Sequence, residues 1–284
     1  MSFLISIFIL VIVYKRIHPL ISNVPVLLTC NTYLTLLFGA LMMVIIYSYS
    51  IYGDIYASDS CNNYLCQLHG YFIHVFICAF YYSCVLQAIL RLFRIVFYKQ
   101  KRLQSHHLFF IGIIIQWLIS FLYILIHLLT KDFEYSSFAH SCWISFKNIR
   151  ALFQALLIMY VGPISSVCLI YAYIIRYTRQ TIHIQQQRQI LNRRDILVLK
   201  RILIVVLVAM GIGIATVFTL MNYIITNYLI PIAYHLQGLS ISGGFIIGSI
   251  SFAFITPQIH NIFKMRQRRV NPATMITITS RRPH

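Results

Sequence analysis

The sequence predicts an all-α membrane protein, a bundle of seven transmembrane helices. Apolar residues make up 60% of its 284 residues and charged residues only 10%, whereas a soluble globular domain carries about 25% charged residues. Apolar stretches of the length that crosses a bilayer recur along the chain. Basic residues gather between alternate stretches, a pattern typical of membrane proteins. Together these observations exclude an ordinary soluble protein.

A short apolar stretch at residues 2–14 comes first. Its thirteen residues extend only about 20 Å as a helix, less than the roughly 30 Å of a bilayer core. A signal peptide would begin with basic residues and end in small ones, but here Lys15 and Arg16 follow the apolar run. We interpret the stretch as a first transmembrane helix that lacks its outer half.

Six longer stretches follow, each able to cross a bilayer as a helix. They occupy residues 24–47, 65–97, 108–129, 152–175, 196–225 and 229–259. We expect all of them to be helical, because lipid offers no hydrogen-bond partner to an exposed backbone group. The transmembrane domain then covers residues 1–262. Residues 263–284 form a short basic tail, whose first half is expected to lie as a helix on the membrane lipid.

Lysine and arginine separate clearly between the two sides of this arrangement. Twenty of them lie on one side, within residues 15–16, 91–102, 176–201 and 264–282, and three lie on the other, Lys131, Lys147 and Arg150. Because basic loops remain in the cytoplasm, we expect the N-terminus outside and the C-terminus inside, in a multi-pass protein of the plasma membrane. This pattern accounts for the net charge of +18, and we expect no nucleic-acid partner.

Two cysteines stand out on the expected outer side. Cys66 begins the third stretch, and Cys142 lies in the loop after the fourth. This side is oxidising, so a disulfide between them would tie that loop to the helix bundle. Cys61 is also on this side and is a competing partner.

Further residues occur at regular places in the stretches. Arg91 follows Cys66 by 25 residues, about seven helical turns, so the two mark opposite membrane surfaces. An arginine there either snorkels to the headgroups or faces the bundle as a switch. The chain resembles a divergent rhodopsin-like (class A) G-protein-coupled receptor with a truncated N-terminus. The residues that carry this resemblance, by their order, spacing and membrane side, are Cys66, Arg91, Trp117, Pro163, Tyr171 and the sequence Thr256-Pro257-Gln258-Ile259-His260.

The resemblance implies a receptor that binds an extracellular ligand and activates a heterotrimeric G protein by helix rearrangement. It gives Trp117 a structural role. It also implies a signal-transduction switch formed by Arg91, Tyr171, Pro163, Pro257, His260 and Asn31. Several motifs differ from the family pattern. Leu90 replaces the acid of Asp-Arg-Tyr, His260 takes the tyrosine position of Asn-Pro-x-x-Tyr, and residues 210–221 contain no Cys-Trp-x-Pro.

The ligand site of such a bundle is expected in its outer half, between apolar walls. The candidate ligand-binding residues are His69, Ile73, His74, Ile77, Met159, Tyr160, Asn222, Tyr223, Gln237 and Ile246. The aspartate that grips amines in related receptors would fall at Ile73, and the lysine that carries retinal near Ile250. We therefore expect a neutral small molecule or a peptide as ligand, and no cofactor.

Three other functional classes are alternatives to a signalling receptor. A metal hydrolase is disfavoured, because His69 and His74 diverge by about 140° around a helix and no span holds a carboxylate to complete a ligand set. We therefore expect no metal site and no enzymatic activity. A transporter or channel usually shows charges, broken helices or repeats within its spans. Only Pro163, Pro257 and the glycines Gly243, Gly244 and Gly248 hint at these features, and a transporter or channel is kept as an alternative. A receptor-like protein that no longer signals and pairs with intact receptors remains an alternative, because several motifs are changed.

Overall fold

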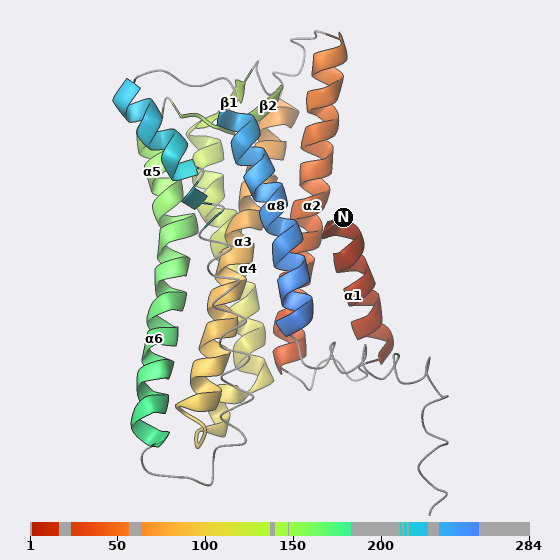
Figure 1. Ribbon diagram of the computed structural model, residues 1–284. Helices are drawn as coiled ribbons and strands as arrows, with labels where there is room; N and C mark the ends of the chain where they lie inside the picture. The colour runs from red at the N-terminus through yellow and green to blue at the C-terminus, as the bar shows by residue number, and fades with distance from the viewer. Residues whose placement is uncertain are drawn as a thin grey trace, which may run out of the picture.

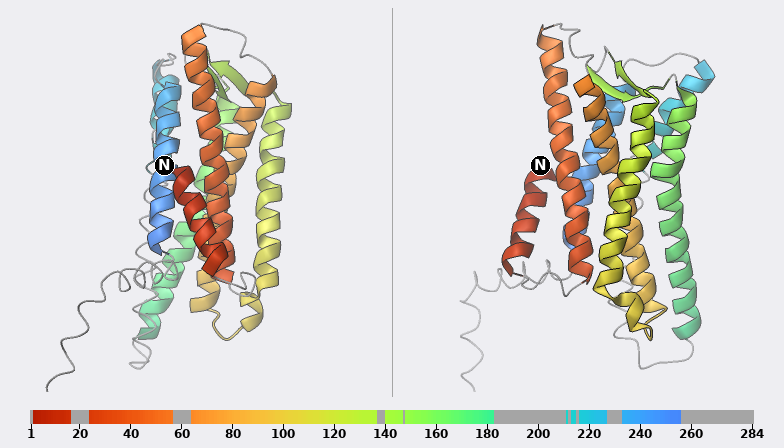
Figure 2. Two further views of the ribbon diagram at one scale, coloured as in Figure 1. Left: turned by 90° about the vertical axis from the view of Figure 1, so that its right-hand side faces the viewer. Right: turned by 180° about the vertical axis from the view of Figure 1, so that it is seen from behind.

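The computed structural model describes residues 2–16, 24–56, 64–136, 140–146, 148–182, 211, 213–214, 216–226 and 233–255. Helices dominate it, and the long ones stand side by side with a small hairpin across one end (Figures 1 and 2). Four described helical segments are long and apolar enough to cross a membrane: Val24–Ile55, Tyr64–Ile95, His106–Leu129 and Ile149–Gln180. The structure therefore has the helices of a membrane protein.

Helix α3 (Tyr64–Ile95) is the centre of the bundle. It packs against α2 (Val24–Tyr56), α4 (His106–Leu129) and α6 (Gly162–Ile182). In the most apolar part of α3, 61% of the residues are buried, whereas the corresponding value for α4 is 22%. Helix α4 therefore lies at the edge of the bundle, and its many exposed leucines and isoleucines form the kind of surface that lipid covers.

The chain between residues 149 and 182 is helical but not uniform. Helix α5 (Ile149–Ala155) continues into a π-helical segment, η4 (Leu156–Val161), and then into α6. Pro163 explains the irregularity, because proline lacks an N–H and its ring crowds the carbonyl four residues earlier. The N–H of Gly162 instead bonds the carbonyl of Leu157, five residues back. Such π segments widen a helix locally.

Helix α1 (Ser2–Arg16) packs against α2 and α8 (Ala233–Ile255). Its first residue lies near the middle of α8, where the Ser2 hydroxyl donates to the carbonyl of Phe245, 3.1 Å away, and lies 2.7 Å from the Ser249 hydroxyl. From there α1 runs toward the end of the bundle opposite the hairpin (Figure 1).

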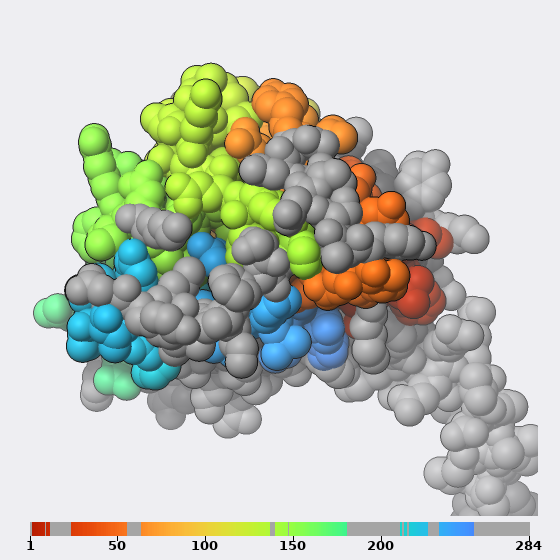
Figure 3. All heavy atoms as spheres, turned by 90° about the horizontal axis from the view of Figure 1, so that it is seen from above, coloured from red at the N-terminus to blue at the C-terminus, as the bar shows by residue number. Residues whose placement is uncertain are grey.

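Two short strands form an antiparallel hairpin over the end of the bundle. Strand β1 (Phe133–Ser136) pairs with β2 (Ser141–Ile144), with Phe133 opposite Ile144. Every residue of β2 is buried. Seen from above, the yellow-green hairpin atoms lie beside the orange ends of α2 and α3 and the blue atoms of the last helices (Figure 3).

Helix boundaries differ from the predicted stretches mainly at α2, which continues nine residues beyond the expected end at residue 47. Hydropathy indicates where lipid contact ends rather than where a helix ends. The extension stays helical, and the Ser48 hydroxyl bonds back to the carbonyl of Val44. Much of the expected stretch 196–225, the end of 229–259 and the tail 263–284 lie outside the described residues.

Candidate functional site

A cavity lies below the hairpin, between α3, the α5–η4 segment, residues 213–216 and α8. About 90 Å³ of it is open to the centres of water molecules, enough for several waters at roughly 10–15 Å³ each. It is lined by His74, Ile77, Tyr81, Ile144, Leu152, Ala155, Leu156, Met159, Tyr160, Gly213, Thr216, Gln237 and Ile241. Of these described lining residues, none carries an acidic, lysine or arginine side chain.

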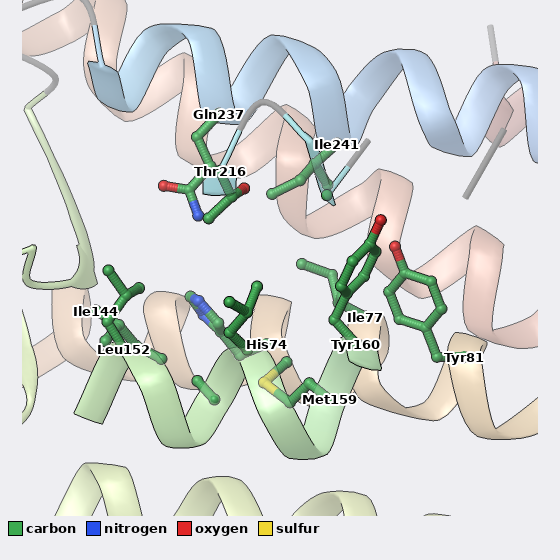
Figure 4. A pocket seen from close by; sticks show the side chains of 13 residues that line it. His74, Ile77, Tyr81, Ile144, Leu152, Met159, Tyr160, Thr216, Gln237 and Ile241 are labelled. Carbon is green, nitrogen blue, oxygen red and sulfur yellow. The ribbon is translucent and has the colours of Figure 1, made fainter. Parts of the chain in front are cut away.

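Helical periodicity brings these residues together. His74, Ile77 and Tyr81 lie three and four residues apart on α3, so they share one face. The α5–η4 segment repeats this spacing with Leu152, Ala155, Leu156 and Met159. On α8, Gln237 and Ile241 lie one turn apart. Figure 4 shows His74 and Gln237 pointing into the cavity from opposite sides.

The hairpin lies over one end of the cavity, which its Ile144 lines. A disulfide joins Cys142 of β2 to Cys66 at the start of α3, with an S–S distance of 2.04 Å. One turn further along α3, Gly70 has no Cβ, and a Cβ there would lie 2.8 Å from the carbonyl oxygen of Cys142. The rings of Phe133 and Trp143 pack edge-on against His74, with centroids 5.3 Å and 5.7 Å away.

A buried carboxylate fixes the hairpin to the neighbouring helices. Asp132 lies 2.8 Å from Nδ1 of His127 at the end of α4, and it accepts hydrogen bonds from the Thr130 hydroxyl at 2.5 Å and from Nδ2 of Asn148 at 2.7 Å. Asn148 in turn caps α5 by accepting from the N–H of Ala151. Asp132 therefore joins the end of α4, the hairpin and the start of α5.

Two polar side chains give the cavity its chemical character. Nδ1 of His74 lies 2.7 Å from the carbonyl oxygen of Gly70. A carbonyl only accepts, so Nδ1 carries the hydrogen and Nε2 of the neutral ring is an acceptor. Among the described residues, Oε1 of Gln237 is buried without a hydrogen-bond partner. The cavity is thus mostly apolar, and it offers the acceptors Nε2 of His74 and Oε1 of Gln237 beside the NH2 of Gln237 and three hydroxyls.

Five of the ten residues expected to bind ligand line this cavity: His74, Ile77, Met159, Tyr160 and Gln237. The others do not. Ile73 is fully buried in the core, and the ring of His69 lies tilted against that of Tyr49 of α2, with ring centroids 5.1 Å apart. Asn222, Tyr223 and Ile246 are partly buried outside the cavity lining.

Sequence reasoning missed eight lining residues: Tyr81, Ile144, Leu152, Ala155, Leu156, Gly213, Thr216 and Ile241. The helical spacing from Ile77, Met159 and Gln237 would have found five of them, Tyr81, Leu152, Ala155, Leu156 and Ile241. Helical spacing could not predict Ile144, because it lies on strand β2 of the loop between α4 and α5. At Gly213 the Tyr160 ring approaches the backbone so closely that a Cβ would overlap the ring.

At the far end of α3, Arg91 lies within electrostatic range of the Tyr171 hydroxyl on α6. Arg91 is partly buried and Tyr171 is buried, so the two expected switch residues lie near each other. Pro163 follows the π segment. The expected switch residues Pro257 and His260 lie outside the described residues.

Asn31 faces α4. Its Oδ1 accepts a hydrogen bond from Nε1 of Trp117 at 3.0 Å, and its Nδ2 donates to Oε1 of Gln116 at 2.9 Å. Gln116 continues the network to α3 by donating to the carbonyl of Ala79 at 2.7 Å. Asn31 and Gln116 therefore join α2, α4 and α3 through buried hydrogen bonds.

The family model described as 7 transmembrane receptor (rhodopsin family) matches residues 6–237. The chain belongs to this family. The match runs from α1 into α8 and contains the hairpin, the disulfide and the Arg91–Tyr171 pair. A comparison with curated proteins finds no match. The protein is thus a membrane protein of a receptor family, with a cavity at the hairpin end and an arginine near the other.

Proposed function

We propose that the protein is a plasma-membrane receptor that binds an uncharged extracellular molecule in the cavity and activates a heterotrimeric G protein by helix rearrangement. The observation that carries this proposal is the cavity itself. It lies beneath a disulfide-anchored hairpin, and none of its described lining residues carries an acidic, lysine or arginine side chain. A charged ligand there would lose its hydration without gaining an ionic partner.

Two continuous helical segments connect the cavity to the Arg91 end. Helix α3 carries both His74 and Arg91, which are seventeen residues and about 26 Å apart along the helix. The η4–α6 segment carries both Tyr160 and Tyr171. A ligand that changes how these segments pack at the cavity therefore also changes how Arg91 meets Tyr171. This supports Arg91 as a switch rather than a lipid anchor.

Basal nucleotide exchange tests the proposal without a known ligand. In the family pattern, an acid at the position of Leu90 forms an ion pair with the arginine in the resting state. A partly exposed pair of this kind stabilises the resting state by about 1 kcal/mol. Because Leu90 cannot form it, the fraction of active receptor should be about fivefold higher. Purified receptor in lipid nanodiscs should accelerate GTPγS uptake by at least one class of purified G protein. Arg91→Ala should reduce this rate to that of the G protein alone.

Arg94→Ala is the matched control, because Arg94 lies on the same helix, carries the same charge and is exposed. It should retain the basal rate. An unchanged rate in Arg91→Ala would make Arg91 a membrane anchor. If the unmodified receptor accelerates no G protein, the alternative of a receptor-like protein that pairs with intact receptors gains support.

A further inference from the structure

Two polar groups of the cavity offer hydrogen-bond acceptors to a ligand, Nε2 of His74 and Oε1 of Gln237. Nε2 of His74 is an acceptor because Nδ1 is committed to the carbonyl of Gly70 at 2.7 Å. Packing of the ring between Phe133 and Trp143 fixes its orientation. Oε1 of Gln237 is buried and, among the described residues, has no hydrogen-bond partner. A buried acceptor without a partner is costly, so a molecule that donates to it gains affinity.

The cavity also contains the NH2 group of Gln237 and the hydroxyls of Thr216, Tyr81 and Tyr160. The Tyr160 hydroxyl is hydrogen-bonded to the backbone of Gly213. The ring of Tyr160 also packs edge-on against Tyr81, with centroids 5.5 Å apart. Figure 4 shows the two tyrosines at one end of the cavity, away from His74 and Gln237. The remaining described wall is largely aliphatic, with Ile77, Ile144, Leu152 and Ile241 among its members.

We propose that this cavity selects uncharged, largely apolar molecules that present a hydrogen-bond donor, an N–H or O–H group, to Oε1 of Gln237 and Nε2 of His74. This inference rests on the proposed function, since it names the class of ligand for the same cavity. Ligands whose only polar groups are acceptors, such as ethers and esters, bind more weakly, because they bond only to the NH2 of Gln237 or the hydroxyl of Thr216 and offer no donor to these two acceptors. Two acceptors that face such a ligand would lose water without compensation.

Indole and benzofuran are suitable probes, because they have nearly the same shape and differ in the N–H donor, which benzofuran replaces by an acceptor oxygen. Their affinities are measured from the concentration dependence of the unfolding temperature of purified receptor. The unmodified protein should bind indole about tenfold more tightly than benzofuran. Equal affinities, or binding of neither probe, would overturn the inference.

Two variants locate the preference. Gln237→Met keeps the length of the side chain and removes the acceptor, and His74→Phe keeps the aromatic packing and removes Nε2. The variant at the acceptor that the indole N–H reaches should lower the affinity for indole while changing that for benzofuran little, and the double variant should bring the ratio close to one. Gln100→Met makes the same chemical change at an exposed site far from the cavity, and its ratio should equal that of the unmodified protein.

The outcome is independent of signalling, because probe binding needs no G protein. If the tenfold preference is present but the unmodified receptor accelerates no G protein, the proposed G-protein coupling fails and the ligand class stands. If exchange depends on Arg91 but the ratio is one, the receptor function stands and the ligand class fails. A ratio that stays at ten in the double variant would also overturn the inference, because the donor would then bind elsewhere.

Discussion

A single amide connects three helices at the residue scale. Asn31 uses both ends of its side chain, accepting from Trp117 and donating to Gln116, and Gln116 passes the contact on to α3. All three side chains lie wholly or partly within the protein. Removal of the amide would leave an indole N–H and an amide oxygen without partners in an apolar environment, where each costs about 1–3 kcal/mol.

Asn31→Leu keeps a similar volume and removes both hydrogen bonds. We expect it to lower the unfolding free energy by roughly 2–4 kcal/mol, and the unfolding temperature in detergent by several degrees. The control is Asn222→Leu, because Asn222 is partly exposed and no side-chain bond is described for it. Equal unfolding temperatures for the two variants would show that the α2–α4 network contributes nothing measurable.

The same residue shows the limit of sequence reasoning about a site. The resemblance assigns Asn31 to the signalling switch, whereas its hydrogen bonds in the structure lead to α4. A soluble helix reveals its inner face by its polar outer face, but α2 is apolar around its whole circumference, so spacing alone does not orient it. The same limit applies to α3. Ile73 was expected in the cavity but is buried in the core, whereas its neighbour His74 lines the cavity. Neighbouring residues point about 100° apart around a helix, so they face different surroundings.

At the scale of elements, the hairpin depends on close contact with α3. The disulfide fixes β2 at Cys142, and Gly70 allows the backbone of β2 to approach the helix. A Cβ at Gly70 would lie 2.8 Å from the carbonyl oxygen of Cys142 and 3.0 Å from the ring of Phe133. Strand β2 would therefore have to move away from the cavity that it closes.

Gly70→Ala should destabilise the protein by about 1–3 kcal/mol through this overlap and weaken indole binding. The control, Gly243→Ala, also places an alanine in a helix, but a Cβ there meets nothing within 4 Å, so helix propensity should make it neutral or slightly stabilising. Unfolding temperatures and hydrogen exchange of the β2 peptide measure the two effects. Indistinguishable exchange in the two variants would mean that Gly70 does not hold the hairpin in place.

The elements themselves were predictable to different degrees. Apolar length indicated the long helices, because a helix that crosses lipid must be apolar over about 20 residues. The hairpin was not predicted, because its strands are four residues each and are stabilised by a disulfide, by Asp132 and by packing on α3. The π segment follows from Pro163, but sequence does not distinguish a kink from an added residue in the turn.

At the scale of the whole molecule, charge and structure agree on two different ends. The hairpin end carries Asp54, Asp132 and Glu134, and Asp54 lies 3.4 Å from Nε2 of His140. At the opposite end, the described loop between α3 and α4 contains Lys99, Lys101 and Arg102. Because basic loops remain in the cytoplasm, we expect the hairpin outside the cell and that loop inside.

Engineered glycosylation sites test this orientation directly. The natural sequence has no Asn-x-Ser/Thr acceptor, so a new one reports on its location without background. Ala139→Asn creates an acceptor with His140 and Ser141 in the hairpin, and Leu103→Asn creates one with Gln104 and Ser105 in the loop between α3 and α4.

Glycans are added only on the lumenal side, which becomes the cell exterior. After expression in mammalian cells, the Ala139→Asn variant should migrate more slowly on a gel and return to its original mobility with a glycosidase, while the Leu103→Asn variant should not change. The reverse pattern would place the basic loops outside and would remove the argument that the Arg91 end faces a G protein.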